Sequence, residues 1–266
     1  MIFDESGRVL ISPSRLKTWQ ECPMKWKSVY VDEIRTPPTP SLVFGSAIHK
    51  ALESFHRARW LGESISQQEL ESAFATALQI ECNPVGGVHV EVNEVEMWAQ
   101  AKALIALYTS EFEGERVAAA ELMLSAPLVD ETGEDLGATL NGVIDLITAD
   151  RKVVDLKSSA RTSNLFDLAI AHSVQLDAYR YLMLHSAGHE PDSVEIRLLV
   201  RKKQPEVQTF RLPMRTSLAP FLDLCRRYIA FVHHSEAVLP RPGMFCGQSC
   251  PAYVPCRVFH GLPEVA

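Results

Sequence analysis

Apolar residues recur every three or four positions through the first 113 residues, which is the spacing of amphipathic helices. The Ser-Pro-Ser segment at 12–14 predicts the start of the first helix, because Ser12 or Ser14 can cap it. The same spacing predicts further helices at about 45–60, 67–80 and 91–113.

After residue 115 the pattern becomes that of alternating strands and helices. This order predicts an α/β domain with a central mixed sheet flanked by helices. We expect the N-terminal helices and the C-terminal tail to lie on one side of that sheet. The predicted strands are at about 116–128, 138–148, 153–157, 193–200 and 206–212, and the predicted helices are at about 166–186 and 216–234.

A chain of 266 residues with 47% hydrophobic and 22% charged residues can bury a sizeable core, which excludes a mostly disordered protein. No apolar run is long enough to span a membrane, and the first residues do not form a signal peptide. We therefore expect a cytoplasmic protein with no membrane partner. The net charge of −7 argues against a protein that coats nucleic acid nonspecifically, but it is compatible with a nucleic-acid enzyme.

Three of the six cysteines, Cys246, Cys250 and Cys256, lie close together in a segment rich in glycine and proline. Cys22, near the N-terminus, is the natural fourth member of a four-thiolate site that would fasten the two ends of the chain together. Thiolates suit both zinc and iron–sulfur clusters, so the spacing leaves both open. The alternative is four unrelated reduced thiols. Cys225 lies in an apolar stretch, where a buried small side chain is expected.

Two acids and a lysine form a candidate metal site. Asp155 and Lys157 alternate along a predicted strand and therefore point to the same face, and a hairpin-like return would bring Asp145 beside them. Two carboxylates bind a hard cation such as Mg²⁺ or Mn²⁺, which polarises a phosphoryl oxygen and lowers the pKa of bound water. Lys157 would orient that water or stabilise the developing charge. By itself, an Asp-x-Lys triplet is more often an ion pair at the end of a strand.

Two predicted helices carry further polar candidates. His49 follows a glycine one turn into its helix, and His56 lies on roughly the same face, so either histidine is a candidate ligand. Gln175 and Tyr179 are four residues apart and share one helix face, where they could hold the lysine, the attacking water or a phosphate. Taken singly, each of these residues is better explained as an ordinary structural or surface side chain.

The combination of these segments resembles a known family. The segments GSAIH at 45–49, GVID at 142–145, DLK at 155–157 and QLDAY at 175–179 occur in this order. Together they resemble the RecB-like branch of the PD-(D/E)XK nuclease superfamily, over about residues 12–260. The four cysteines match its iron–sulfur subgroup, which includes the nuclease domain of AddB and the CRISPR-adaptation exonucleases. In that subgroup one cysteine precedes the nuclease core and three follow it.

The resemblance implies a restriction-endonuclease-like core in a single nuclease domain over residues 1–266. It implies a mainly helical part at about 12–113, an α/β core at about 115–235 and a cysteine tail at about 240–260. The implied metal ligands are His49, Asp145, Asp155 and the backbone carbonyl of Leu156, with Lys157 as the catalytic lysine, Gln175 and Tyr179 completing the site, and Glu121 as an extra acid. The implied ligands of a [4Fe-4S] cluster are Cys22, Cys246, Cys250 and Cys256.

Two features depart from the family pattern. Asp155 stands where many relatives have glutamate, and the shorter side chain reduces the reach to the metal. The gap between Cys246 and Cys250 is one residue longer than expected, which keeps zinc as an alternative to the cluster.

Two basic runs are candidates for binding DNA phosphates near the site. One is the segment 197–203, which begins with Arg197 and ends in three consecutive basic residues, and the other surrounds Cys22. Aromatic residues beside Cys22 could stack on the bases of a single strand, although packing in the core explains the tryptophans better. The basic residues of the second run are Arg15, Lys17, Lys25 and Lys27, and the aromatic residues are Trp19, Trp26 and Tyr30.

The leading hypothesis is a metal-dependent DNA exonuclease that acts on single strands or DNA ends in repair or recombination. The chain lacks the glycine-rich phosphate loop of a helicase motor, so any unwinding would come from a helicase, recombination or CRISPR partner. The alternative hypothesis is a nonenzymatic DNA-end-binding or assembly module in which an iron–sulfur or zinc site is structural.

Overall fold

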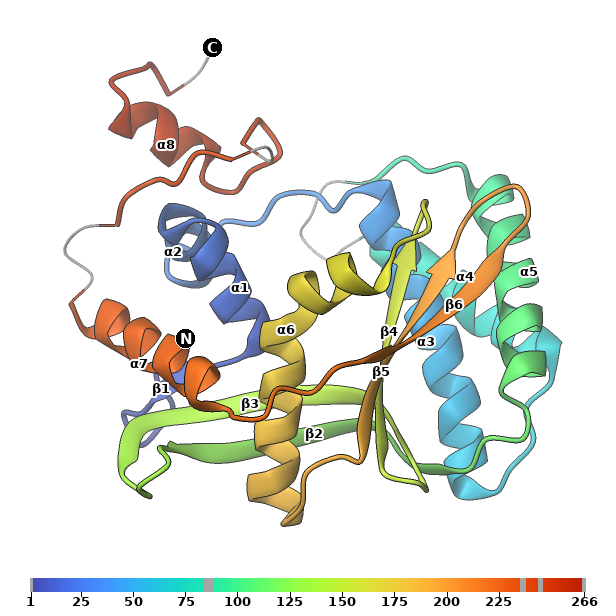
Figure 1. Ribbon diagram of the computed structural model, residues 1–266. Coiled ribbons are helices and arrows are strands. Elements are labelled where there is room, and N and C mark those ends of the chain that lie inside the picture. The colour runs from blue at the N-terminus through green and yellow to red at the C-terminus, as the bar shows by residue number, and fades with distance from the viewer. Residues whose placement is uncertain (1, 84–88, 235–237, 244–245, 265–266) are drawn as a thin grey trace.

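The computed structural model describes residues 2–83, 89–234, 238–243 and 246–264. Its centre is a mixed sheet in the order β1-β3-β4-β5-β6 (Figure 1). β1 and β4 pair with one edge of β3, and β2 pairs with the opposite edge. The predicted central mixed sheet flanked by helices is therefore confirmed. The strands are β1 (Val9–Ile11), β2 (Val117–Val129), β3 (Asp135–Thr148), β4 (Lys152–Ser159), β5 (Ser193–Val200) and β6 (Glu206–Leu212).

The register of the central strands sets the position of the candidate acids. β3 is antiparallel to β2 and β4, and β4 is parallel to β5. Leu146 of β3 pairs with Val154 of β4. Asp145 and Asp155 are the next residues beyond that pair, so the hairpin brings the two acids to neighbouring positions, as the sequence predicts.

Helices cover both faces of the sheet. The helices α3, α4 and α5 pack on one face and share an apolar core with β4 and β5, whereas α1, α2, α6 and α7 lie on the other face (Figure 1). The helices are α1 (Pro13–Glu21), α2 (Pro23–Tyr30), α3 (Pro40–Leu61), α4 (Gln67–Cys82), α5 (Glu94–Glu111), α6 (Leu165–Leu182), α7 (Ala219–His233) and α8 (Tyr253–Phe259).

The structure corrects several details of the prediction. The N-terminal helices do not lie together on one side, because α1 and α2 pack beside α6 and α7 while α3 to α5 cover the opposite face. Ser12 caps α1 as predicted, by accepting a hydrogen bond from the backbone N–H of Arg15. α3 begins at Pro40, earlier than predicted, because the Thr39 hydroxyl caps it.

Three elements are absent from the prediction: the short strand β1, a separate helix α2 beginning after Cys22, and the helix α8 within the cysteine tail. Each is short, and short elements carry little periodic signal in the sequence. Cys225 is fully buried, as predicted. Within the described residues, no helix has both the length and the apolar character needed to cross a bilayer.

Candidate active site

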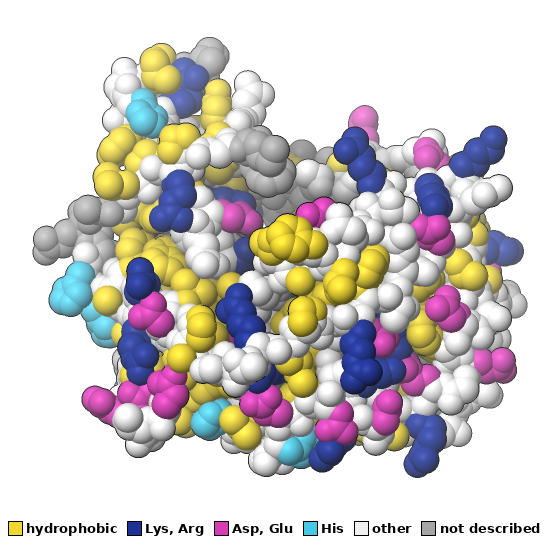
Figure 2. Space-filling model, viewed as in Figure 1, with side chains coloured by type: hydrophobic (Ala, Val, Ile, Leu, Met, Phe, Trp, Pro, Cys, Tyr) yellow, Lys and Arg dark blue, Asp and Glu magenta, His cyan; other side chains and the backbone are white. Residues whose placement is uncertain are grey.

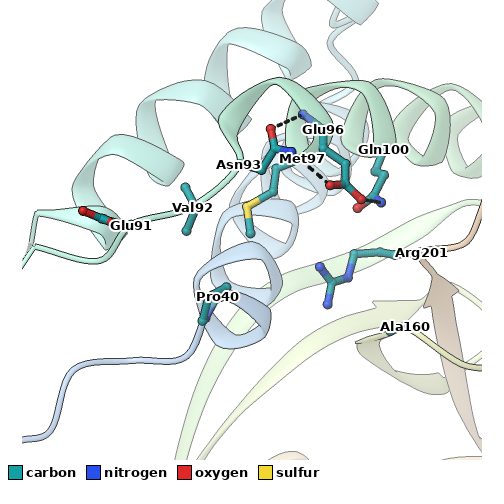
Figure 3. A pocket seen from close by; sticks show the side chains of 9 residues that line it. All are labelled: Pro40, Glu91, Val92, Asn93, Glu96, Met97, Gln100, Ala160 and Arg201. Atoms are coloured by element: carbon teal, nitrogen blue, oxygen red, sulfur yellow. Dashed lines mark hydrogen bonds between the residues drawn. The ribbon is translucent and has the colours of Figure 1, made fainter.

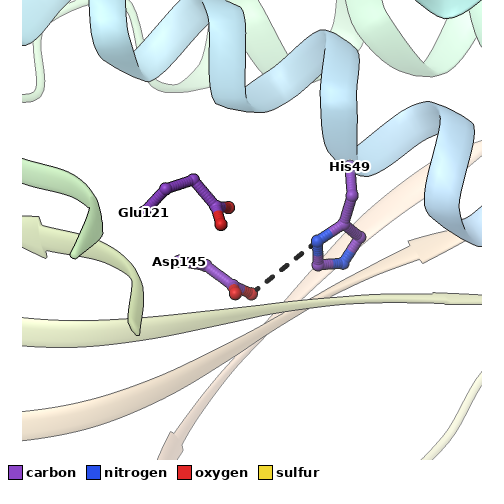
Figure 4. Close-up of side chains that lie close together, drawn as sticks. All are labelled: His49, Glu121 and Asp145. Carbon is purple, nitrogen blue, oxygen red and sulfur yellow. Dashed lines mark ion pairs between the residues drawn. The ribbon is translucent and has the colours of Figure 1, made fainter. Parts of the chain in front are cut away.

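The side chains of His49, Glu121 and Asp145 point toward one another from three different elements (Figure 4). One possible ligand atom from each lies within 4.8 Å of the other two. A nitrogen and carboxylate oxygens at this separation suit a divalent cation. Within the described part of the chain, no other three histidine, cysteine or acidic side chains meet this criterion.

His49 is oriented by a hydrogen bond to the neighbouring strand β4. Its Nε2 donates to the backbone carbonyl of Leu156 over 2.7 Å, because a carbonyl oxygen can only accept. The other ring nitrogen, Nδ1, is then unprotonated in the neutral ring, and it lies 3.9 Å from Oδ2 of Asp145. This tautomer leaves the lone pair of Nδ1 available to a metal ion, while the second nitrogen fixes the ring.

Glu121 reaches the cluster from an irregular point in β2. Its backbone has a φ of 50°, which is the left-handed region that residues other than glycine seldom adopt. The paired residues on either side of it are Ala120 with Leu146 and Leu122 with Ile144, so the irregularity lies opposite Asp145. The residue with the strained backbone is the same one whose carboxylate points into the cluster, and such strain is typical of functional sites.

The cluster concentrates negative charge in a partly enclosed place. Burial, together with the neighbouring carboxylates of Asp145 and Glu53, raises the pKa of Glu121 to about 7. Burial also raises the pKa of Asp145, and the charge of Asp155 adds to this effect. The backbone N–H of Leu156 donates to Oδ2 of Asp145 over 2.7 Å and fixes that carboxylate. Such a site favours a cation, which would relieve the repulsion between the acids.

Asp155 belongs to a second network on the α6 side of the sheet. Its carboxylate is fully buried and forms an ion pair of 2.6 Å with Nζ of Lys157. The side-chain amide of Gln175 donates both to Oδ1 of Asp155, over 2.9 Å, and to the hydroxyl of Tyr179, over 2.7 Å. Burial raises the pKa of Tyr179, so its hydroxyl stays protonated. This network fixes the lysine beside the metal-binding cluster.

Gly45 allows α3 to approach β4 closely. A Cβ atom at this position would lie 3.0 Å from Oγ of Ser158, which is tighter than almost all real contacts. The close approach brings His49, one turn further along α3, into hydrogen-bonding distance of Leu156. The glycine of the GSAIH segment therefore has a packing role.

The cluster opens into a cavity of about 630 Å³. Its lining includes Lys157 and Gly45, and it also includes Lys50 and Glu53, which the sequence analysis did not identify. Glu53 lies four residues after His49, so helical spacing would have placed both on one face. The volume is large enough for a nucleotide-sized ligand.

The structure therefore brings the predicted residues together in two adjoining groups. His49, Asp145 and Glu121 form the first group. The second group contains Asp155, Lys157, Gln175 and Tyr179. The carbonyl of Leu156 lies between them as the acceptor for His49, in a structural contact that the sequence did not predict.

Two other candidates, His56 and Arg197, have structural roles. His56 is buried, its Nε2 is 2.9 Å from the hydroxyl of Tyr108, and burial lowers its pKa to about 3, so it is not the ligand. Arg197 is fully buried in ion pairs with Glu115 and Glu195. The prediction that it contacts phosphates is therefore wrong.

Trp26 is also buried, and its Nε1 donates to the hydroxyl of Tyr228 over 3.0 Å, so it cannot stack on bases. Trp19 packs edge-on against the same tyrosine, as expected for a core residue. Lys25 and Lys27 form ion pairs with Glu21 and Asp32 on the surface.

The four cysteines predicted to form one site line a single cavity of about 460 Å³ between α2 and the C-terminal tail. Cys22 lies at the junction of α1 and α2, whereas Cys256 lies on α8. Burial raises the pKa of Cys256, and the charges of the other three cysteines raise it further, so all three lie near enough to act on this thiol. The backbone N–H groups of Arg241 and Gly243 point at the sulfurs of Cys22 and Cys246, over 3.3 and 3.2 Å.

Comparisons with known proteins agree with this architecture. The family model of the PD-(D/E)XK nuclease superfamily matches residues 10–257. The crystal structure of a protein named "Putative exonuclease" from Eubacterium rectale superposes with a TM-score of 0.58 at 14% identity, covering 94% of this chain and 87% of that one. The crystal structure of SSO0001 matches at 13% identity over 80% of this chain and 85% of that one, with a TM-score of only 0.33. No curated protein sequence matches the chain.

Proposed function

Because the chain belongs to the PD-(D/E)XK nuclease superfamily, we propose that it is a metal-dependent exonuclease that cleaves single-stranded DNA or DNA ends. The observation that carries this proposal is the cluster of His49, Glu121 and Asp145 beside the Asp155–Lys157 pair in one cavity. The choice of an exonuclease is supported by the name of the Eubacterium rectale protein with the same fold.

The residues present fit a divalent cation. Nδ1 of His49 and the carboxylates of Glu121 and Asp145 would hold Mg²⁺ or Mn²⁺, with Asp155 close by as the fourth predicted ligand. When bound, such a cation polarises a phosphoryl oxygen and lowers the pKa of coordinated water. Burial first, and the neighbouring acids second, raise the pKa of Glu121 and of Asp145, and a bound cation would offset both effects.

The chain's own groups would then orient the reactants. The ammonium group of Lys157, held by Asp155, donates hydrogen bonds to the attacking water or to the phosphate and stabilises the charge that develops there. Gln175 and Tyr179 keep Asp155 in one rotamer, so the lysine remains aimed at the cavity. The hydrogen bond to the carbonyl of Leu156 keeps the ring of His49 oriented.

We also propose that Cys22, Cys246, Cys250 and Cys256 bind a [4Fe-4S] cluster that fastens the tail to α2. The sulfurs of a tetrahedral zinc site lie about 3.8 Å apart, given zinc–sulfur bonds of about 2.3 Å. Among the described residues, no three of these sulfurs lie within 4.8 Å of one another, which favours the larger cluster over zinc. When bound, the cluster supplies a covalent cross-link between the two ends of the domain.

The partner of such an enzyme is DNA. The chain has no motif for a motor, so a helicase or a recombination or CRISPR protein would have to deliver a single strand to it. This assignment rests on the chemistry of the site and on the family.

The direct test is digestion of end-labelled single- and double-stranded DNA, with and without Mn²⁺, by protein purified anaerobically. We expect labelled products only with the metal and only from substrates with a free end. Cleavage of a circular single strand would argue against an exonuclease. Absorbance near 400 nm together with iron analysis tests the cluster, and zinc without iron would contradict it.

A further inference from the structure

A second cavity, of about 590 Å³, lies beside the candidate active site at the start of α3. Pro40 lines this cavity, whereas the next residue, Ser41, lines the catalytic one, so the first turn of α3 separates the two. Ala160 also lines it, three residues after Lys157, which along a strand is a distance of roughly 10 Å. A single strand that occupies the catalytic cavity can reach this one within a few nucleotides.

Arg201 lies on one wall of this cavity, opposite the side chains of α5 (Figure 3). Its guanidinium group stacks over the ring of Phe44, 4.5 Å from the ring centre, and donates to the hydroxyl of Ser41 over 3.1 Å. Among the described residues it forms no direct ion pair, and its Nε is buried without a hydrogen-bond partner. Burial lowers the pKa of Arg201, while the charge of Glu96 across the cavity raises it. Most other described basic residues of the sheet, such as Arg197, have acidic partners. The planar guanidinium group is therefore fixed and able to donate to an incoming anion.

The opposite wall includes three polar side chains from the start of α5, which form one network (Figure 3). Glu91, Val92 and Met97 also line the cavity. The side-chain amides of Asn93 and Gln100 donate to the two carboxylate oxygens of Glu96, over 3.2 and 3.1 Å. A carboxylate repels a phosphate but accepts hydrogen bonds from the amino groups of nucleic-acid bases. The two walls therefore differ in the chemistry they offer, with a cation on one and acceptors on the other.

We propose that this cavity is a binding subsite for one nucleotide of a single-stranded substrate, outside the cleaved bond. Arg201 takes the backbone phosphate, and the Asn93–Glu96–Gln100 network faces the edge of the unpaired base. This inference rests on the proposed function, because it is the strand in the catalytic cavity that would deliver the nucleotide. The base must be unstacked to enter a concave site, which excludes intact duplex at this position.

The first test measures binding separately from cleavage. A fluorescent single-stranded oligonucleotide is titrated by anisotropy in buffer without a divalent cation, so that it remains intact. We expect Arg201→Ala to raise the Kd at least about tenfold, as for loss of hydrogen bonds to a charged group. The matched control is Lys102→Ala, which removes an α5 lysine that lies 3.7 Å from Glu71 and should leave the Kd unchanged. Equal Kd values for Arg201→Ala and the unaltered protein would overturn the subsite.

The second test separates the subsite from the structural role of Arg201 against Phe44. With Mn²⁺, Arg201→Ala should raise KM for the oligonucleotide and leave kcat within about twofold, whereas hydrolysis of bis(4-nitrophenyl) phosphate, which is too small to reach the cavity, should not change. An equal loss with both substrates would mean that Arg201 only positions α3, and would overturn the proposal.

Gln100→Ala, on the wall away from α3, should also raise the Kd for the oligonucleotide, by a few fold. If its Kd is unchanged, the assignment of the base to that wall is wrong. If the unaltered protein binds the strand through Arg201 but never cleaves it, the proposed function fails while the subsite stands.

Discussion

The candidate active site and the cysteine lobe, which comprises residues 238–243 and 246–264, are held in place in different ways. α3, which carries His49, buries nine of its residues against the rest of the protein, whereas α8, which carries Cys256, buries none. In Figure 1, α8 stands apart from the sheet and its covering helices. The catalytic groups are therefore organised by the apolar core, and the lobe is not.

The lobe also differs from the core in where its hydrophobic side chains lie. Hydrophobic side chains lie on its outside, where they contribute little to folding (Figure 2). Its contacts with the N-terminal helices include hydrogen bonds from Arg241, whose N–H points at the sulfur of Cys22. The comparison teaches that the apolar core positions the candidate active site, whereas on our proposal the lobe would depend on a bound cluster for its stability. The exposed hydrophobic residues of the lobe are Val254, Val258, Phe259 and Leu262.

The largest expected effect concerns the preorganised region. Asp145→Asn keeps an acceptor for the N–H of Leu156 but removes a metal-binding charge. We expect kcat to fall by a factor on the order of 10³, because several kcal/mol of transition-state stabilisation are lost. The melting temperature should stay level or rise, since burial and Asp155 already disfavour the charge. Nuclease assays and calorimetry measure both, with Asp192→Asn as the surface control, and a large drop in melting temperature would contradict the preorganised site.

For a substitution in the cysteine lobe we expect the opposite result, a clear fall in melting temperature. Cys256→Ser removes one thiolate, so we expect the loss of cluster absorbance and a melting temperature lower by about 5–10 °C, equivalent to a few kcal/mol. Limited proteolysis should cut first within the lobe. Ser249→Ala, in the same lobe but without a thiol, is the matched control. Native melting of the cysteine variant would show that the lobe does not depend on its ligand.

A smaller effect tests how finely the core positions the catalytic groups. Gly45→Ala places a Cβ 3.0 Å from Oγ of Ser158, so either this hydroxyl or α3 must shift by a few tenths of an ångström. We expect kcat/KM to fall about tenfold with little loss of stability, because small displacements of catalytic groups are costly. The double variant with Ser158→Ala removes the close contact and should recover most of the activity. If it does not, the approach of α3 is not what positions His49.

The last prediction concerns how the stability of the core depends on pH. The pKa of His56 is lowered to about 3 in the folded protein by burial, against about 6.5 in the unfolded chain. The unfolded chain therefore binds more protons below pH 6.5, and the core loses stability as the pH falls. We expect a loss of up to about 2 kcal/mol between pH 7 and 5, measured by urea unfolding. His56→Gln should be less stable at pH 7 but should show a flatter pH dependence.

Much of the architecture follows from local sequence patterns. The strand predicted at 193–200 matches β5, and the helix predicted at 67–80 lies within α4, which has a complete capping box at Ser66 and Glu69. Strong period and clear caps make such elements predictable. β1 and α8 are too short to show a clear period in the sequence, and β1 forms by pairing with β3.

The candidate site was predictable in its residue types and less so in its contacts. The strand alternation of Asp155 and Lys157 predicts their shared face, and the ion pair agrees. The sequence cannot reveal that Arg197, in a run of basic residues, is fully buried against Glu115 and Glu195. Glu195 is two residues away on the same strand, but Glu115 lies 82 residues earlier, just after α5, so that pairing depends on tertiary packing.

The sequence by itself determined the order of helices and strands and the set of groups able to bind a cation, because periodicity and donor chemistry are local properties. Only the tertiary structure decided that Glu121 joins His49 and Asp145, and that His56 is withdrawn into the core. It also placed Arg201, alone among the segment 197–203, against a cavity beside the site. Which groups meet depends on strand register and on the approach of α3 to β4, and both are set by contacts between residues far apart in the chain.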